Sequence, residues 1–298
     1  MKILLFGKGG QVGWELQRSL QPIGTVVPVD FDSTDFCGDF SNPDGVIETV
    51  RRVLPDIIVN AAAHTAVDKA ESEAEFALTL NATTPGALAR AAAETGAWLM
   101  HYSTDYIFDG SGTTPWMEDS PTGPLSVYGR TKLEGETLIR ASGCKHLIFR
   151  TSWVYAARGG NFAKTMLKLA QEREKLTVID DQFGAPAGAD LLADLTALAL
   201  RTAQQRPEVS GTYHVAPQGE TTWHGYATHV IGFARAAGVP IKVATDAIAA
   251  VPTSAFPTPA KRPANSRLDT RKLRETFGVN LPDWRTGVDR MLTEVLGR

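Results

Sequence analysis

One tyrosine and one lysine in this sequence have a spacing that suits proton transfer. Tyr128 and Lys132 lie four residues apart, so on a helix they share one face, one turn from each other. A phenol has a pKa near 10, and a neighbouring ammonium stabilises the phenolate and lowers that pKa. Such a pair can exchange a proton with a carbonyl or alcohol oxygen. The spacing also fits two surface residues of an amphipathic helix, but only Tyr128 of the 6 tyrosines is followed by a lysine in this way.

A glycine-rich turn near the N-terminus indicates a dinucleotide cofactor. Gly7, Gly10 and Gly13 stand between the apolar run Lys2–Phe6 and a helical pattern over Trp14–Leu20. Glycines permit the tight turn and let backbone N–H groups approach a pyrophosphate at the helix N-terminus. The spacing is one residue wider than the NAD-enzyme fingerprint. Its position between a predicted strand and a predicted helix still predicts cofactor binding here.

Further polar residues follow other predicted strands. Asp30 ends the strand Thr25–Val29, where an acidic residue usually holds the adenosine ribose hydroxyls. Ser103 and Thr104 end the strand Ala97–Tyr102. In open α/β sheets, ligands bind beyond the carboxyl ends of the strands. We therefore expect Thr104 to lie where a reacting carbonyl would be.

Strands and helices alternate over the first half of the chain. This pattern predicts an α/β fold with a doubly wound parallel sheet, Rossmann-like, and a smaller C-terminal substrate-binding lobe. We expect a dinucleotide-binding domain over residues 1–150. Residues 151–298 would form mainly the substrate-binding lobe, with segments near 190–216 able to return to the main sheet. The remaining expected elements include a strand at Pro55–Asn60, helices at Pro43–Val53, Glu71–Thr95 (broken or bent near Pro85-Gly86), Asn161–Arg173, Ala189–Gln205 and Trp223–Ala237 (capped by Thr222), and strands at His146–Arg150, Leu176–Ile179 and Gly211–Ala216.

The composition excludes several classes of protein. Of the 298 residues, 43% are hydrophobic and 21% are charged, as in an ordinary globular protein. The net charge of −3 gives no reason to expect nucleic acid or an anionic membrane as a partner. No apolar run approaches the roughly 20 residues of a membrane span. Met1 leads directly into a short strand rather than a signal peptide, and Cys37 and Cys144 are too few for a disulfide framework, so we expect a cytoplasmic protein.

These motifs together resemble a known family. The glycine turn, Ser103-Thr104 and Tyr128-x-x-x-Lys132 are similar to the extended short-chain dehydrogenase/reductase superfamily, and within it to the dTDP-4-dehydrorhamnose reductase family. The narrower likeness rests on segments in order along nearly the whole chain: 5–8 (LFGK), 60–68 (NAAAHTAVD), 103–106 (STDY), 149–155 (FRTSWVY), 181–186 (DQFGAP) and 262–266 (RPANS).

The resemblance implies a reaction. A hydride from NADPH or NADH would pass to C4 of dTDP-4-dehydro-L-rhamnose, and Tyr128 would protonate the new oxyanion. Lys132 would hold the nicotinamide ribose and lower the pKa of Tyr128, while Thr104 would hydrogen-bond the same oxygen. The sugar nucleotide would also meet Asp105 and Trp153, with Arg262 at its diphosphate. The implied cofactor-binding residues are Gly7, Gly10, Gln11, Val12, Gly13, Asp30, Asp39, Phe40, Ala63, His64, Thr65, Tyr102, Tyr128 and Lys132.

The resemblance also implies a metal site. In some relatives, three glutamates from two subunits bind Mg²⁺ and bridge a homodimer. The matching positions here are Glu15, Asp190 and Glu294, of which Asp190 is one methylene shorter. The alternative is three unrelated surface carboxylates. If the site exists, we expect a structural Mg²⁺ that supports a homodimer, because no catalytic step needs the ion.

Three other functions fit parts of the pattern. A sugar-nucleotide 4,6-dehydratase would carry an acid where Tyr106 stands, after Thr104-Asp105. A nucleotide-sugar epimerase shares the core motifs but not the downstream segments. A non-catalytic relative, like the regulatory subunit of methionine adenosyltransferase, would share the fold without needing Thr104, Tyr128 and Lys132.

Overall fold

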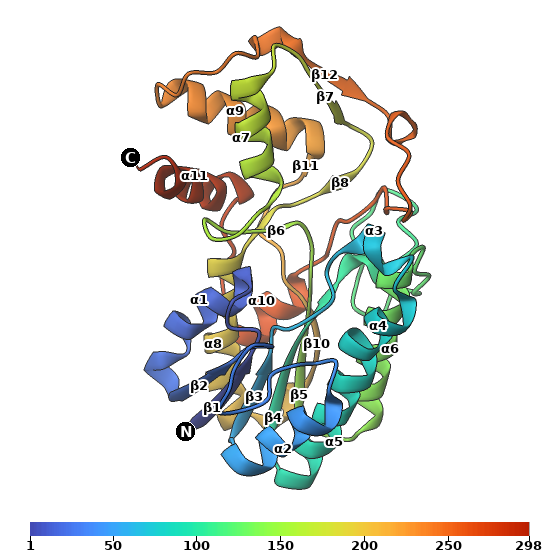
Figure 1. Ribbon diagram of the computed structural model, residues 1–298, viewed down its shortest axis with the longest axis vertical. Coiled ribbons are helices and arrows are strands. Elements are labelled where there is room, and N and C mark those ends of the chain that lie inside the picture. The colour runs from blue at the N-terminus through green and yellow to red at the C-terminus, as the bar shows by residue number, and fades with distance from the viewer. Residues whose placement is uncertain (298) are drawn as a thin grey trace.

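A six-stranded parallel sheet forms the base of the molecule (Figure 1). The computed structural model describes residues 1–297. The strands run in the order β10-β5-β4-β3-β1-β2, and every neighbouring pair is parallel. Their bounds are β1 Lys2–Phe6, β2 Thr25–Val29, β3 Ile57–Asn60, β4 Trp98–Thr104, β5 His146–Thr151 and β10 Gly211–His214.

Helices cover both faces of this sheet, as predicted for a doubly wound fold (Figure 1). On one face, Leu16 of α1 and Leu192 of α8 pack with Leu273 of α10 against the strands. On the other face, the packing residues include Val46 of α2 and Leu88 of α5. The helices of the first face are α1 Gln11–Ser19, α8 Ala189–Gln205 and α10 Arg271–Phe277, and those of the second are α2 Pro43–Val53, α5 Thr84–Thr95 and α6 Val127–Ala141. Burial on both faces explains why the strands read as apolar runs.

The long helix expected over Glu71–Thr95 is divided. The structure has α3 at Val67–Ala70, α4 at Ala74–Leu78, a π-helical turn at Thr79–Thr83 and then α5. Pro85 has no N–H to give to the carbonyl of Asn81. That carbonyl instead faces α6, where a Cβ on Gly135 would lie 2.1 Å from it. The break therefore precedes the proline and lets α6 approach closely.

A smaller lobe lies above the carboxyl ends of the strands (Figure 1). It has its own apolar cores, in which Tyr226 and Trp284 are fully buried. Thr222 caps α9, as predicted, by accepting a hydrogen bond from the N–H of Gly225. The elements of this lobe are α7 Phe162–Glu172, α9 Trp223–Ala236, α11 Trp284–Val295, and the strand pairs β7 Leu176–Ile179 with β12 Ile248–Val251, β8 Phe183–Gly184 with β11 Thr221–Thr222, and β6 Val154–Tyr155 with β9 Ala187–Gly188.

The chain returns to the sheet after entering the lobe. Gly211–His214 forms β10, which pairs with β5 at the edge of the sheet, and α8 packs on α1. Short 3₁₀ helices occur at Gln21–Ile23, Asp105–Ile107, Pro207–Val209, Thr245–Ala247 and Thr253–Ala255. Within residues 1–297, no helix combines the length and the apolar character needed to cross a membrane.

Candidate active site

A cleft of about 490 Å³ opens at the carboxyl edge of the sheet, below the lobe. Its lining comes from the first turn of α1, the ends of the central strands, the start of α6 and two tryptophans. Of the predicted site residues, those that line it are Gly10, Gln11, Val12, Ala63, Thr65, Tyr102, Thr104, Asp105, Tyr128, Lys132 and Trp153. The fold thus brings the three predicted catalytic residues to one cavity with part of the glycine turn.

Tyr128 is placed by the start of α6. The helix begins at Val127, and the Ser126 side chain caps it by accepting a hydrogen bond from the N–H of Gly129. Burial raises the pKa of Tyr128 to about 12, although a hydrogen bond with Thr104 acts in the opposite direction. The expected lowering of this pKa by Lys132 is therefore not found, because desolvation of the phenolate outweighs the favourable contacts of the phenol.

Lys132 lies one turn further along α6 and is only 2% exposed. Its Nζ is 2.5 Å from the carbonyl oxygen of Tyr102 and 3.3 Å from Nε2 of His101. Burial lowers the pKa of Lys132 to about 8, while the charge of Glu136 acts to raise it. The lysine can therefore gain or lose its proton close to neutral pH.

Thr104 and Asp105 stand where β4 gives way to a 3₁₀ turn. The Thr104 hydroxyl accepts a hydrogen bond from the N–H of Tyr106 and donates to Oδ1 of Asp105, 3.2 Å away in each case. Asp105 is 1% exposed. Burial raises the pKa of Asp105 to about 6, against hydrogen bonds from Ser266 and Thr104. A carboxyl group in this state can both accept and donate hydrogen bonds near neutral pH.

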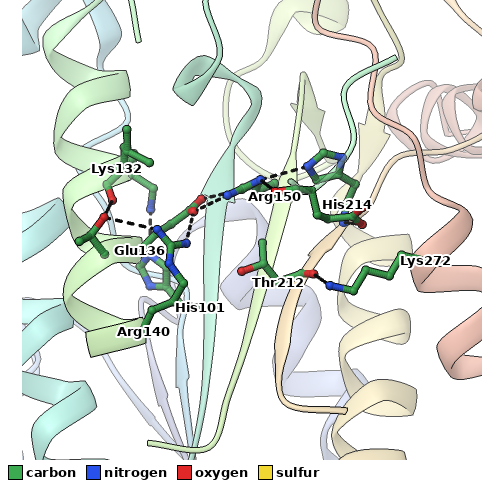
Figure 2. Close-up of polar contacts among 11 residues, drawn as sticks. His101, Lys132, Glu136, Arg140, Arg150, Thr212, His214 and Lys272 are labelled. Carbon is green, nitrogen blue, oxygen red and sulfur yellow. Dashed lines mark hydrogen bonds and ion pairs between the residues drawn. The ribbon is translucent and has the colours of Figure 1, made fainter. Parts of the chain in front are cut away.

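A buried ion cluster fixes α6 beneath the cleft (Figure 2). Arg150 of β5 makes two hydrogen bonds to Glu136, of 2.9 Å from Nε and 2.7 Å from Nη2. Arg140 adds a third of 2.8 Å, and Arg150 also donates to the carbonyl of Glu118. Burial acts to raise the pKa of Glu136, but the contacts with Arg150 and Arg140 outweigh it and the pKa is lowered. The cluster joins α6 to β5 and to the loop that precedes Tyr128.

The glycine turn fits a dinucleotide. Gly7 has φ of +83°, and a Cβ on Gly13 would lie 1.9 Å from the carbonyl oxygen of Gly7, so the turn admits no side chain at these positions. Gly10 begins α1 without any side-chain cap. The first N–H groups of the helix are therefore available to a phosphate, and the helix dipole favours its negative charge.

Other predicted cofactor residues do not line the cleft. Asp30 accepts hydrogen bonds from the N–H groups of Gly9 and Phe31 at 2.7 and 2.9 Å. Asp39 binds Ser41 by its Oδ1. These two aspartates thus support local turns.

Phe40 and His64 are both buried within the fold. Phe40 packs edge-on against Phe6, with ring centroids 5.4 Å apart. The backbone of His64 is held by Asn81, and its Nε2 lies 3.4 Å from Glu73. Neither residue lines the cleft.

Two tryptophans form the lobe side of the cleft. Trp153 has φ of +50°, a conformation uncommon for residues with a side chain. Its ring stacks on that of Trp223, with centroids 3.8 Å apart and planes 19° apart. Sequence reasoning singled out Trp153 but not Trp223, nor Thr151 and Ser152, which also line the cleft. Trp223 carried no local signal, because it reaches the site only through this stacking.

Arg262 is held away from the cleft lining. Its guanidinium forms a bidentate ion pair with Asp68, with distances of 3.1 Å to Oδ1 and 2.7 Å to Oδ2. The hydrogen bond from Arg262 lowers the pKa of Asp68. The sequence predicts that Arg262 contacts a diphosphate. For this contact, the ion pair with Asp68 must open, or the guanidinium N–H groups must bind Asp68 and the diphosphate together.

The predicted Mg²⁺ site is not supported. Among residues 1–297, no group of three or more His, Cys, Asp or Glu side chains is placed to hold a metal ion. Asp190 is instead ion-paired with Arg290. Burial raises the pKa of Glu15, and the charges of Asp190 and Glu294 add to this effect. The three carboxylates are thus near enough to interact, but the guanidinium of Arg290 already supplies the positive charge at Asp190.

The chain is similar over almost its whole length to known proteins. Residues 1–296 match the family model described as RmlD substrate binding domain. A dTDP-4-dehydrorhamnose reductase of Shigella flexneri is 62% identical over 295 residues, covering 99% of this chain and 98% of the relative. One from Escherichia coli K12 has the same identity and coverage.

Solved structures give the same result. The structure of a dTDP-4-dehydrorhamnose reductase from Clostridium acetobutylicum has a TM-score of 0.89 and 35% identity, with both chains fully covered. That of the Bacillus anthracis reductase, in complex with NADP, has a TM-score of 0.86 and 32% identity, covering 98% of this chain and 99% of the other. On the family model, the identities and the shared fold, this chain belongs to the dTDP-4-dehydrorhamnose reductase family.

Proposed function

We propose that this protein reduces the C4 keto group of dTDP-4-dehydro-L-rhamnose to give dTDP-L-rhamnose, with NADPH or NADH as reductant. The observation that carries the proposal is the meeting of Thr104, Tyr128 and Lys132 in the cleft that the glycine turn also lines. Family membership supports the substrate, because the relatives of 62% identity are reductases of this sugar nucleotide.

When bound, the nicotinamide cofactor would supply the hydride. The residues of this chain bind the cofactor, hydrogen-bond the keto oxygen and supply the proton. The turn around Gly10 offers N–H groups to the pyrophosphate, and Lys132 is within the same cleft for the nicotinamide ribose. In the proposed reaction the Thr104 hydroxyl turns from Oδ1 of Asp105 and donates its hydrogen bond to the keto oxygen, which becomes more negative as hydride arrives. Tyr128 then passes its phenolic proton to that oxygen.

The protonation states suit reduction. A phenol with a pKa near 12 stays protonated at neutral pH and is ready to donate. An alkoxide is a stronger base than a phenolate, so the transfer runs toward the alcohol. A charged Lys132 near the phenolate favours the product state of this transfer. Activity should therefore fall as the pH rises above about 8, where Lys132 loses its charge.

The lobe provides the sugar-nucleotide side of the cleft. Trp153 and Trp223 present an apolar stacked surface opposite the catalytic residues. Asp105 lies beside Thr104 and can hydrogen-bond a sugar hydroxyl. Arg262 is ion-paired with Asp68, which follows the lining residue Val67, and it carries the positive charge that a diphosphate requires.

The test is the consumption of NADPH when the purified protein meets dTDP-4-dehydro-L-rhamnose. We expect loss of the absorbance of the reduced nicotinamide and formation of dTDP-L-rhamnose in equal amounts. A folded protein that leaves NADPH unchanged would favour a non-catalytic role. A sugar product that forms without consumption of NADPH would indicate an epimerase or a dehydratase. A homodimer and a cytoplasmic location remain predictions, to be tested by sedimentation and by cell fractionation.

A further inference from the structure

The amide of Asn60 has one possible orientation. Asn60 ends β3 and is the register partner of His101 in β4. One atom of its amide lies 3.0 Å from the backbone N–H of Ala62. A backbone N–H can only donate, so this atom is the carbonyl oxygen. The NH₂ group therefore faces His101, with Nδ2 3.0 Å from the Nδ1 of the ring.

This orientation fixes the tautomer of His101. The ring is 1% exposed, and burial, with the nearby charge of Lys132, holds the pKa of His101 well below its ordinary value. The ring is therefore neutral at physiological pH and carries one proton. Because Nδ1 accepts from Asn60, that proton must be on Nε2. The resulting N–H is directed at Nζ of Lys132, 3.3 Å away.

Nζ of Lys132 thus faces the Nε2–H group of His101, which is a hydrogen-bond donor, whereas an ammonium at Nζ would need an acceptor. An ammonium has three N–H groups and no lone pair, whereas the neutral amine can accept the hydrogen bond from His101. The other close partner of Nζ, the carbonyl of Tyr102, accepts from either form. The charged groups around it are Glu136 on the same helix, which favours the ammonium, and the two arginines that neutralise Glu136.

A second buried histidine shows the opposite arrangement. Nδ1 of His214 lies 3.0 Å from the carbonyl oxygen of Trp116, so it must carry the proton. Nε2 of His214 is then free to accept from Nη1 of Arg150, 3.4 Å away. Both rings face a basic side chain (Figure 2), yet His214 offers it a lone pair and His101 offers it an N–H.

We propose that Asn60 and His101 are positioning residues that weaken the hold of Lys132 on its proton, by presenting an N–H to its nitrogen. This contact makes the lysine easy to deprotonate. Ribose hydroxyls of a bound cofactor would supply the missing acceptors and so favour the ammonium. The acidity of Tyr128 is then greatest when the cofactor is in place. This proposal rests on the proposed function, in which Lys132 assists Tyr128.

The tautomer can be measured without any assay of activity. In protein labelled with ¹⁵N-histidine, the nitrogen shifts and two-bond proton couplings distinguish Nε2–H from Nδ1–H rings. We expect the Nε2–H form for His101 and the Nδ1–H form for His214, which is the control within the same spectrum. His101→Gln and His214→Gln assign the two signals by their loss. An Nδ1–H or doubly protonated His101 in the free protein would overturn the proposal.

Two substitutions at Asn60 test the effect on Lys132. Asn60→Asp keeps an acceptor for Ala62 and turns a second oxygen toward Nδ1 of His101, which moves the ring proton to Nδ1. Asn60→Leu removes the donor to Nδ1 of His101 without adding a charge. The ammonium of Lys132 can then donate to Nε2, and the ring proton moves to Nδ1 as in Asn60→Asp. In both variants we expect the pH at which kcat/KM declines on the alkaline side to rise by about one unit. This shift in pKa corresponds to the free energy of one hydrogen bond to a charged group.

Comparison of the two variants distinguishes an effect of the His101 tautomer on Lys132 from an effect of a new charge at position 60. A shift in Asn60→Asp alone would mean that the new carboxylate acts through its charge, and the proposal would fail. The proposal would also fail if Asn60→Leu folds, its His101 carries the proton on Nδ1, and the alkaline decline of kcat/KM still occurs at the wild-type pH. If the protein has no reductase activity at all, the proposed function fails, while the ¹⁵N measurement still decides the tautomer.

Discussion

The two sides of the cleft differ in origin and in chemistry. The sheet side comes from the first turn of α1, the ends of β3 and β4 and the start of α6, and Lys132 and Thr104 on this side are hydrogen-bonded to neighbouring residues. The lobe side is dominated by Trp153 and Trp223, which stack on each other and present apolar faces. In the proposed reaction, the sheet side would hold the groups that transfer the proton, and the lobe side would offer a surface for recognition of the sugar nucleotide. Substitutions on the two sides should therefore affect different kinetic constants.

The largest expected effect is on the sheet side, at Tyr128. We expect Tyr128→Phe to lower kcat by about 10²–10⁴-fold, because the proton donor is lost, while the protein still binds NADPH. Lys132→Met should lower both kcat and cofactor affinity, since the lysine has two roles. Tyr226→Phe is a matched control, because the hydroxyl of Tyr226 makes no hydrogen bond within residues 1–297. Near-normal turnover of Tyr128→Phe would remove Tyr128 from the mechanism.

The ion cluster below the sheet side should matter for stability. Glu136→Gln leaves Arg150 buried without its counter-charge, and we expect the free energy of unfolding to fall by about 3–5 kcal/mol. Glu172→Gln, which breaks the exposed pair with Lys168, should cost roughly 0–1 kcal/mol. Chemical denaturation of both variants gives the comparison. Equal effects would mean that burial of the cluster contributes little.

The same cluster predicts a dependence of stability on pH. The pKa of Glu136 is lowered in the folded protein. Its contribution is therefore complete above the pKa of an unfolded glutamate and is lost as the pH falls through the folded value. Wild-type protein should lose stability below about pH 4 more steeply than Glu136→Gln does.

On the lobe side, the expected effect is on substrate affinity. Trp223→Leu removes the ring that supports Trp153, and aromatic pairs of this kind are worth about 0.5–1.5 kcal/mol beyond their buried area. We expect KM for the sugar nucleotide to rise about three- to tenfold, with KM for NADPH and kcat little changed. A fall in kcat with both KM values unchanged would contradict the division between the two sides.

The smallest effect concerns the choice of cofactor. Asp30 would repel a 2′-phosphate, and Lys8 in the glycine turn would offset this repulsion, so we expect both NADH and NADPH to be used. Asp30→Ala should shift the ratio of kcat/KM values toward NADPH. The shift should be modest, because the carboxylate of Asp30 is already held by two backbone N–H groups. An equal loss of efficiency with both cofactors would show that Asp30 does not touch the ribose.

The sequence was most informative where the chemistry is local. The glycine turn, the ends of strands and the pair Tyr128–Lys132 each lie within a few consecutive residues, so their patterns placed them correctly at the carboxyl edge of the sheet. The predicted parallel sheet is present in the structure, and five predicted elements have the expected bounds at both ends: β1, β2, α2, β7 and α8.

Contacts between distant segments could not be predicted in the same way. Trp223 joins the cleft through Trp153, 70 positions earlier, and Arg262 is engaged by Asp68. The ion pair of Asp190 with Arg290 likewise depends on how α8 and α11 meet. The contact of the Asn81 carbonyl with Gly135 of α6, at the break before α5, also joins distant segments. In each case a partner from another part of the chain decided the outcome.

The most direct test of the proposed reaction follows the hydride itself. Dideuteration of the nicotinamide C4 of NADPH labels both hydrogens that could be transferred. After reaction with dTDP-4-dehydro-L-rhamnose, we expect one deuterium at C4 of the sugar in every dTDP-L-rhamnose formed, as seen by mass spectrometry and NMR. A sugar product without deuterium at C4 would contradict the account, because reduction of the keto group by hydride transfer requires it.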